Sequence, residues 1–290
     1  MNDYVIMTDS SCDMPAELAE ELGLEVVPLS VRAGEQEYVN YLDGREIAFP
    51  EFYNLLRKGV PVQTSAPNVE QFEKVMRKIL ESGRDVLYIA FSSGLSATHG
   101  SGAAAAELLK GEYPDRKIFV VDSLCASLGE GLLVYLTAEK KRAGATVEEA
   151  AKFAEDTKMH ICHWFSVSDL KHLHRGGRVS KTVAIVGSVL NIKPVMHVDN
   201  AGGLALVSKA RGKKSLFKVF VDKARETGYD IKNQTMFISH GDCIEDAREL
   251  AAMLKEQLGV KNVIINYVGP VIGAHSGPGT LAMFFVGDCR

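Results

Sequence analysis

The chain has 290 residues, of which 46% are hydrophobic and 24% are charged. This composition is typical of a soluble globular protein and excludes a disordered chain, a collagen-like fibre and a coiled coil. Lys and Arg number 33 against 37 Asp and Glu, a net charge of −4, which argues against a nucleic-acid partner. No apolar run approaches the roughly 18 residues of a membrane helix, and the first residues lack the positive charge of a signal peptide. We therefore predict a cytoplasmic protein with no membrane span.

In the first half of the chain, β-rich apolar runs alternate with helical patterns. We predict strands at residues 4–7, 25–31, 85–91 and 117–121. Helices are predicted at residues 15–22, 50–58, 68–82, 97–109 and 131–143. Asp13 and Asn68 are the expected N-caps of the first and third of these helices, and Gly23 ends the first. Strands that alternate with helices at this rhythm predict a doubly wound, mostly parallel α/β domain.

Beyond residue 160 the apolar runs shorten and glycine and basic residues increase. A helix at 146–158 leads into this part, and residues 196–207 predict a hairpin with a glycine-rich turn. Helices are expected at 215–228 and 245–258, and strands at 235–238 and 262–267. We predict an α/β fold of two domains, an N-terminal α/β domain at 1–158 and a C-terminal α+β domain at 159–290. The cleft between them is the natural place for a ligand.

The five cysteines are odd in number and widely spaced, with no C-x-x-C pair. In a reducing compartment they are expected to be free thiols, mostly small core residues. His160, Cys162 and His163 with His172 and His174 are the candidate ligands of a zinc site. Structural zinc sites usually pair cysteine or histidine ligands across a loop, and the second pair has no cysteine, so we predict no metal.

Four predicted polar loops could bind a ligand: residues 8–11, 64–67, 92–96 and 273–280. Three of them lie where a predicted strand ends and a helix begins. Ligands of open α/β sheets bind at such strand ends, where helix N-termini offer free N–H groups. Ser and Thr hydroxyls add neutral donors, which suits a carboxylate or a phosphate. The alternative is that these residues serve only as N-caps and turns.

Two enzyme classes were compared with these segments. A serine hydrolase could use Ser96 and His275, since His275 lies in a glycine-rich stretch that allows close backbone approach. However, Thr98 stands where the G-x-S-x-G elbow requires its second glycine. A nucleotide enzyme is disfavoured because no complete phosphate-binding loop is present: the Gly129–Gly131 stretch lacks the third glycine of G-x-G-x-x-G.

Two basic clusters stand out in an acidic chain. The first surrounds Gly176 and Gly177, and the second runs from Lys209 to Lys218 without an acid. Their members are Lys171, Arg175, Arg178 and Lys181 in the first, and Lys209, Arg211, Lys213, Lys214 and Lys218 in the second. They form either solvated faces or a surface that docks an acidic partner or holds a phosphoryl group. Nucleic acid is a third option, but no aromatic residues are interleaved with the basic ones and no known nucleic-acid-binding motif is present.

Taken together, the motifs resemble the DegV family, the fatty-acid-binding component of the bacterial fatty acid kinase system. The motifs are TDSSCDMP at 8–15, PLSV at 28–31, TSAP at 64–67, SSGLSAT at 92–98, DS at 122–123, HRGGRVSK at 174–181, NIKPV at 191–195, Lys209-x-Arg211 and GPVIGAH at 269–275. Their order and spacing span nearly the whole chain. Ala66 stands where the family often has Gln, and Ala97 where it commonly has Gly.

The resemblance implies a lipid-binding carrier rather than an enzyme. A long-chain fatty acid would lie in a buried tunnel between the domains, with no other cofactor. A separate fatty acid kinase subunit would supply the ATP site and phosphorylate the fatty-acid carboxylate. Thr64, Ser96 and His275 would bind that carboxylate. Ser65, Ser93 and Gly94 would add contacts, and Arg178 and Arg211 would serve phosphoryl handling or kinase docking.

Overall fold

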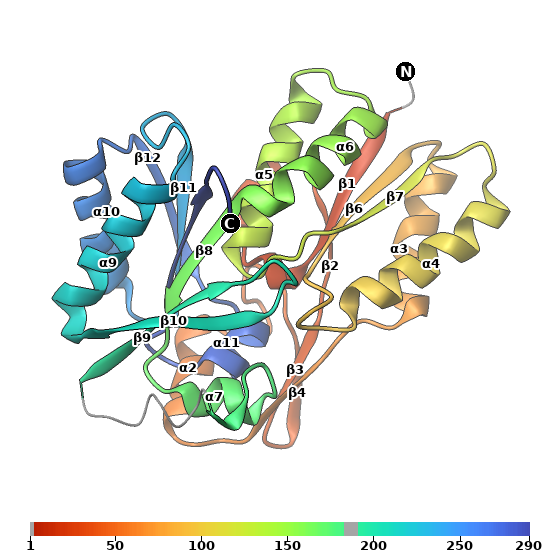
Figure 1. Cartoon of the computed structure of the whole chain (residues 1–290). Helices are drawn as coiled ribbons and strands as arrows, with labels where there is room; N and C mark the ends of the chain where they lie inside the picture. Colours follow the sequence, from red (N-terminus) through yellow and green to blue (C-terminus); the bar gives the residue numbers. More distant parts are fainter. Residues whose placement is uncertain (1–2, 183–190) are drawn as a thin grey trace.

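The computed structural model describes residues 3–182 and 191–290. A four-stranded parallel sheet of order β2-β1-β6-β7 forms the first domain, from β1 (Tyr4–Asp9), β2 (Glu25–Val27), β6 (Asp85–Ala90) and β7 (Ile118–Asp122). Helices α3 (Val69–Glu81) and α4 (Thr98–Glu112) cover one face, and α5 (Leu128–Arg142) and α6 (Val147–Thr157) the other (Figure 1). Every residue of β1 and β6 is buried. Apart from Thr8, Asp9 and Asp85 these strands are apolar, as expected where both faces of a strand pack against helices.

The second domain is built on a six-stranded mixed sheet of order β10-β9-β8-β13-β11-β12. Its strands are β8 (Ile161–Ser166), β9 (Ile192–Val198), β10 (Leu204–Arg211), β11 (Thr235–His240), β12 (Asn262–Tyr267) and β13 (Leu281–Val286). Helices α9 (Gly212–Thr227) and α10 (Ile244–Leu258) bury their apolar stripes on the outer face. On the inner face, Phe237 and Phe284 share one core with Leu132 of α5 and Ile89 of the parallel sheet. Helix α5 therefore packs between the two sheets.

A third, antiparallel sheet of order β4-β3-β5 lies beside the domain junction. It consists of β3 (Ser30–Ala33), β4 (Gln36–Val39) and β5 (Val62–Ser65). Val31 of this sheet packs with Phe52 and Tyr53 of α2 (Phe49–Arg57) and with Ala274 of α11 (Pro270–Ser276). This small core brings β5 and α11 together, and α11 lies beside α2 in Figure 1.

The predicted two-domain α/β fold is confirmed, and three local predictions are wrong. Residues 25–31 form two strands in different sheets, because Pro28 has no N–H to continue a ladder. Asp13 does not cap the first helix, α1 (Ala16–Glu21): Pro15 is its N-cap, and the Asp13 carboxylate accepts a hydrogen bond from the Gly269 N–H instead. His275 lies on α11 rather than in a loop. The boundary at residue 158 stays a prediction.

Three local predictions agree with the structure: the Asn68 cap, the end of the first helix at Gly23 and the free cysteines. Asn68 and Gln71 form a reciprocal capping box at the start of α3, and Gly23 follows α1 with φ of +64°. The five cysteines are free, and Cys12, Cys125 and Cys162 are buried.

In residues 3–182 and 191–290, no His, Cys, Asp and Glu side chains gather in a group able to hold a metal ion. None of the helices in these ranges combines the length and apolarity that a membrane crossing requires.

Candidate functional site: a cavity between the sheets

A cavity of about 250 Å³ lies between the parallel sheet and the inner face of the six-stranded sheet. Most of its wall is apolar, with Phe91 and Leu95 on one side and Phe165 and Phe284 on the other. The remaining apolar residues lining it are Leu29, Ala66, Ala97, Ala126, Leu173, Val198, Leu204, Val268, Val271, Ile272 and Ala282. Ala66 and Ala97, the two departures from the family motifs, therefore face this cavity. A mostly apolar cavity with few polar groups is the usual form of a small-molecule site.

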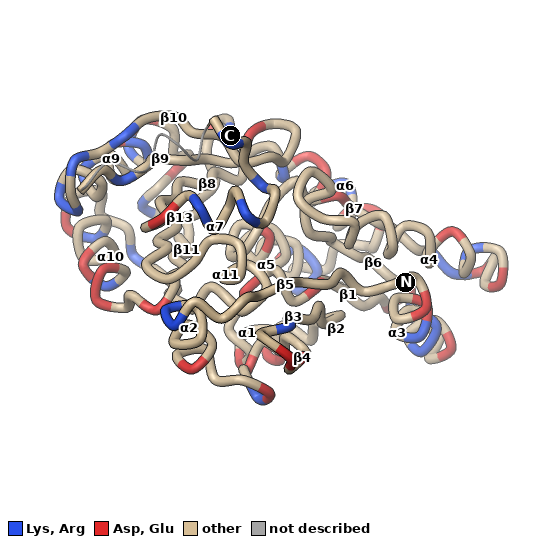
Figure 2. Tube along the Cα trace, turned by 90° about the horizontal axis from the view of Figure 1, so that it is seen from below, with Lys and Arg blue, Asp and Glu red and all other residues tan. Residues whose placement is uncertain are grey.

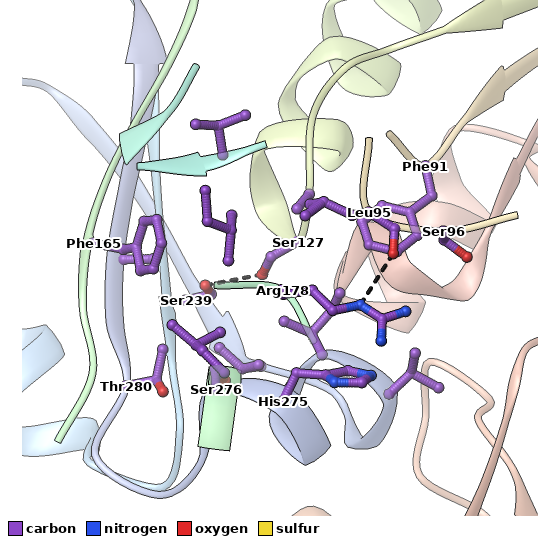
Figure 3. A pocket seen from close by; sticks show the side chains of 18 of the residues that line it. Phe91, Leu95, Ser96, Ser127, Phe165, Arg178, Ser239, His275, Ser276 and Thr280 are labelled. Carbon is purple, nitrogen blue, oxygen red and sulfur yellow. Dashed lines mark hydrogen bonds between the residues drawn. The ribbon is translucent and has the colours of Figure 1, made fainter. Parts of the chain in front are cut away.

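Three of the predicted carboxylate-binding residues, Thr64, Ser96 and His275, line this one cavity. Thr64 lies on β5, Ser96 in the loop after β6, and His275 on α11. The Thr64 Oγ1 atom lies 2.9 Å from Nε2 of His275. Figure 3 shows the His275 ring and Ser96 on either side of the Arg178 guanidinium. The fold thus gathers polar groups from three distant segments at one end of an apolar space.

The His275 imidazole is neutral at pH 7. Burial lowers its pKa to about 4, with smaller contributions from the positive charges of Arg178 and Arg175. Its Nδ1 atom is buried, with no hydrogen-bond partner among the described residues. Gly176 packs directly against this face of the ring. A neutral ring that touches Thr64 can orient a hydroxyl without carrying a charge.

Ser96 is held by the first residue of the helix that follows it, α4. Its Oγ lies 2.8 Å from Oγ1 of Thr98 and accepts a hydrogen bond of 3.2 Å from the Thr98 N–H. This places the hydroxyl at the N-terminal end of α4, where the helix dipole is positive. The Ser96 hydroxyl bonds Thr98 and the His275 ring bonds Thr64, so the described contacts do not form the serine–histidine pair of a hydrolase.

Arg178 also lines the cavity and fastens the neighbouring loop. Its Nε donates to the Leu95 carbonyl at 3.1 Å, and its guanidinium also donates to the Gly176 carbonyl. Burial lowers the pKa of this guanidinium, but arginine keeps its charge in proteins. A permanent positive charge therefore stands at the polar end of the cavity, where an anion would be stabilised.

The other predicted residues do not line the cavity. Ser65 and Ser93 are exposed, and the Ser93 N–H donates to Asp122 at 3.1 Å. Gly94 packs against the β9–β10 turn, because an added Cβ would lie 2.7 Å from the Ala201 carbonyl oxygen. Arg211 is exposed at the end of β10, where α9 begins. Only the Arg178 member of the predicted docking pair reaches the cavity.

The fold partly neutralises the second basic run. Acids that are distant in sequence pair with it: Lys213 lies 3.0 Å from Asp246 and 2.8 Å from Glu249 on α10. Lys218 lies 3.0 Å from Asp222 on its own helix. Figure 2 shows the basic positions of α9 at one end of the molecule, beside the acidic positions of α10.

Sequence reasoning missed a second set of polar residues that line the cavity. These are Ser127, His163, Ser239, Ser276 and Thr280. Ser127 follows β7 and Ser239 lies near the end of β11, so both obey the strand-end rule that selected the other loops. Ser276 and Thr280 belong to the 273–280 segment, of which only His275 was selected.

Comparison with known proteins identifies the family. The model of a family described as "Uncharacterised protein, DegV family COG1307" matches residues 3–288. The chain belongs to the DegV family. A DegV domain-containing protein of Clostridium perfringens is 41% identical over 290 residues, covering 100% of this chain and 99% of the relative. A DegV domain-containing protein of Lactococcus lactis is 35% identical, covering 98% of this DegV chain and 97% of the relative.

Solved structures of DegV proteins share the fold of this family member. A Thermus thermophilus DegV family protein, described as binding fatty acid, has a TM-score of 0.87 at 30% identity, covering 99% of this chain and 100% of its own. DegV of Bacillus subtilis, described as a fatty acid binding protein, has a TM-score of 0.86 at 27% identity, with 99% and 100% covered. A Streptococcus pneumoniae Fatty Acid Kinase B3 protein loaded with linoleic acid, at 22% identity and a TM-score of 0.86, covers 99% and 100% and shows the common fold alone.

Proposed function

We propose that this chain binds a long-chain fatty acid in the cavity between its domains and presents the carboxylate to a separate fatty acid kinase subunit. The observation that carries the proposal is the apolar cavity with Thr64, Ser96, His275 and Arg178 at one end. The Thermus and Bacillus relatives, described as fatty-acid-binding proteins, support the ligand class.

The chemistry of the two ends of a fatty acid suits this arrangement. A 16-carbon chain buries about fifteen methylene or methyl groups, each worth roughly 0.8 kcal/mol, which is enough for tight binding after ordering costs. The carboxylate needs several donors beside apolar walls. Thr64 and Ser96 can each donate a hydroxyl hydrogen to it, and Arg178 supplies positive charge.

His275 then serves as an orienting group. Its Nε2–H would donate to Thr64 Oγ1, across the 2.9 Å contact, which leaves the Thr64 hydrogen free for the carboxylate. The bare Nδ1 would face Gly176 as an unprotonated acceptor. A neutral imidazole suits this role because it can hold the Thr64 hydroxyl in one orientation.

The kinase partnership is proposed from the family motifs and from the placement of the two arginines. Arg178 would stand beside the carboxylate that is phosphorylated, and exposed Arg211 would contact an acidic surface of the kinase. In this division of labour the carrier shields the acyl chain and the partner transfers the phosphoryl group, so we expect no turnover by this chain alone.

The experiment is to purify the protein from bacterial cells without added lipid and compare native with denaturing mass spectra. A one-to-one adduct of fatty-acid mass, released as a free acid on unfolding, is the expected result. A protein that is free of lipid and takes up no added fatty acid would overturn the proposal. Acyl phosphate formed from the loaded protein with ATP and a fatty acid kinase, trapped as hydroxamate, tests the partnership separately.

A further inference from the structure

The cavity has a second polar region, away from the carboxylate end. Figure 3 shows Ser239, Ser276 and Thr280 on the Phe165 side, across the cavity from Ser96. Ser239 is 0% exposed and Ser276 is 5% exposed, and both line the cavity wall. Hydroxyls this deeply buried need hydrogen-bond partners, since a buried polar group left unsatisfied destabilises the fold.

These hydroxyls differ in whether they have a hydrogen-bond partner. Thr280 Oγ1 donates to the Gly277 carbonyl at 2.8 Å and is satisfied. The Ser276 Oγ is buried, and no residue that the structure describes gives it a hydrogen bond. Ser276 is one of the residues that line the cavity, and a hydrocarbon chain alone would leave this hydroxyl without a partner. The structure therefore leaves a place for an oxygen atom on the ligand.

Ser239 belongs to a hydrogen-bonded series that begins at Asp13. Ser127 Oγ lies 2.6 Å from Oδ2 of Asp13 and 3.0 Å from Oγ of Ser239. Asp13 has a left-handed backbone with φ of +52°, and Ser127 with φ of +53°, so both positions hold a backbone that such residues rarely adopt. Hydrogen bonds from Gly269 and Asn266 hold Asp13 in place.

The direction of this series depends on the Asp13 proton. Burial raises the pKa of Asp13 to about 8, so the carboxyl is largely protonated at pH 7. When Asp13 is protonated it can donate to Ser127 and Ser127 can donate to Ser239, which frees the Ser239 hydroxyl hydrogen for a further acceptor. Ser239 then offers a donor on the same side of the cavity as the unpartnered hydroxyl of Ser276 (Figure 3).

We propose that the cavity accommodates an acyl chain that carries an oxygen along its length, as a hydroxyl or a keto group, bound by Ser239 and Ser276. This inference rests on the proposed function, because it places the fatty-acid carboxylate at Thr64. A hydroxyl on the chain would accept from Ser239 and donate to Ser276, whereas a keto oxygen would accept from both.

The test measures the affinity of delipidated protein for stearate, for a series of hydroxystearates that differ in the hydroxyl position, and for the matching ketostearates. We expect one position to bind about 5–10-fold more tightly than stearate. Ser276→Ala and Ser239→Ala should reduce that ratio to about one. Preference for the keto series alone would still support the site and identify both serines as donors.

The matched control is Ser166→Ala. Ser166 Oγ is also buried without a partner among the described residues, but it does not line the cavity. This variant should keep the wild-type ratio, and thermal melts of all three variants check that each is folded. Equal affinity for stearate and for every oxygenated acid would overturn the inference while leaving the proposed function intact. Failure to bind any of the acids, stearate included, would overturn both.

Discussion

The Thr64 hydroxyl and the His275 imidazole meet at 2.9 Å although 211 residues separate them in the chain. One lies on the three-stranded sheet and the other on α11, and their contact closes the polar end of the cavity. Removing the hydroxyl should therefore weaken ligand binding without disturbing the core.

Thr64→Val keeps the shape of the side chain and removes its donor. We expect fatty-acid affinity to fall about tenfold, because one hydrogen bond to a charged group contributes about 1.5 kcal/mol or more. Thr64→Ser is the control and should bind like the wild type. Displacement of a fluorescent fatty acid measures both, and wild-type affinity in Thr64→Val would remove Thr64 from the site.

Gly176→Ala should displace the His275 ring. An added Cβ would overlap Nδ1 of His275, while the φ of −75° at this position suits alanine, so the effect is steric and local. We expect weaker lipid retention, close to that of His275→Ala.

The matched control is Gly100→Ala, on the exposed side of α4, where an added Cβ meets nothing within 4 Å. This change should leave retention unchanged and raise stability by up to about 1 kcal/mol. Equal retention by the wild type, Gly176→Ala and Gly100→Ala would contradict the placement of His275 in the site.

Asp13 should make stability decrease as the pH rises. Its pKa is about 8 in the folded chain and about 3.9 in an unfolded one. Between these values the native state holds a proton that the unfolded state has lost, so the free energy of unfolding falls as the pH rises toward 8. Asp13→Asn mimics the protonated carboxyl and should flatten this slope.

Urea unfolding of the wild type and Asp13→Asn at pH 5, 6, 7 and 8 measures the difference. Burial also raises the pKa values of Asp9 and Glu130, but both proteins contain them, so the comparison isolates Asp13. Parallel pH profiles would show that Asp13 titrates as it does in the unfolded chain.

Arg211→Ala should lower acyl-phosphate formation by the kinase while fatty acid is retained, because Arg211 is exposed and lies outside the cavity. Arg178→Ala should lower both, since Arg178 lines the cavity and fastens Leu95. Arg225→Ala, an exposed cation at the other end of α9 paired with Asp222, is the control. A wild-type rate in Arg211→Ala would exclude Arg211 from the docking surface.

Much of the fold could be predicted because its local signals are strong. The apolar stretch of β6 is buried on both faces, and the Asn68–Gln71 capping box marks the start of α3. The small sheet could not be predicted in the same way. Its strands β4 and β5 are four residues long and partly exposed, so tertiary pairing rather than propensity determines them.

Only those cavity residues that stand in a distinctive sequence motif at the end of a strand could be predicted. Ser96 and His275 stand in unusual glycine- and serine-rich motifs, whereas Ser127 and Ser239 occur in ordinary contexts. Their importance arises from the Asp13–Ser127–Ser239 series, whose members are 112 or more residues apart. No local sequence pattern predicts hydrogen bonds between residues that lie so far apart in the chain.

At Pro28 the chain passes from the parallel sheet to the small antiparallel sheet, which contributes residues to the cavity. After β2 the chain leaves the parallel sheet, builds β3, β4, α2 and β5, and returns at α3. This excursion supplies Thr64 and Ala66 to the cavity lining. None of its strands belongs to the parallel sheet, whose order is β2-β1-β6-β7. Sequence changes within residues 30–65 can therefore alter the lining of the cavity without changing the strand order of the parallel sheet.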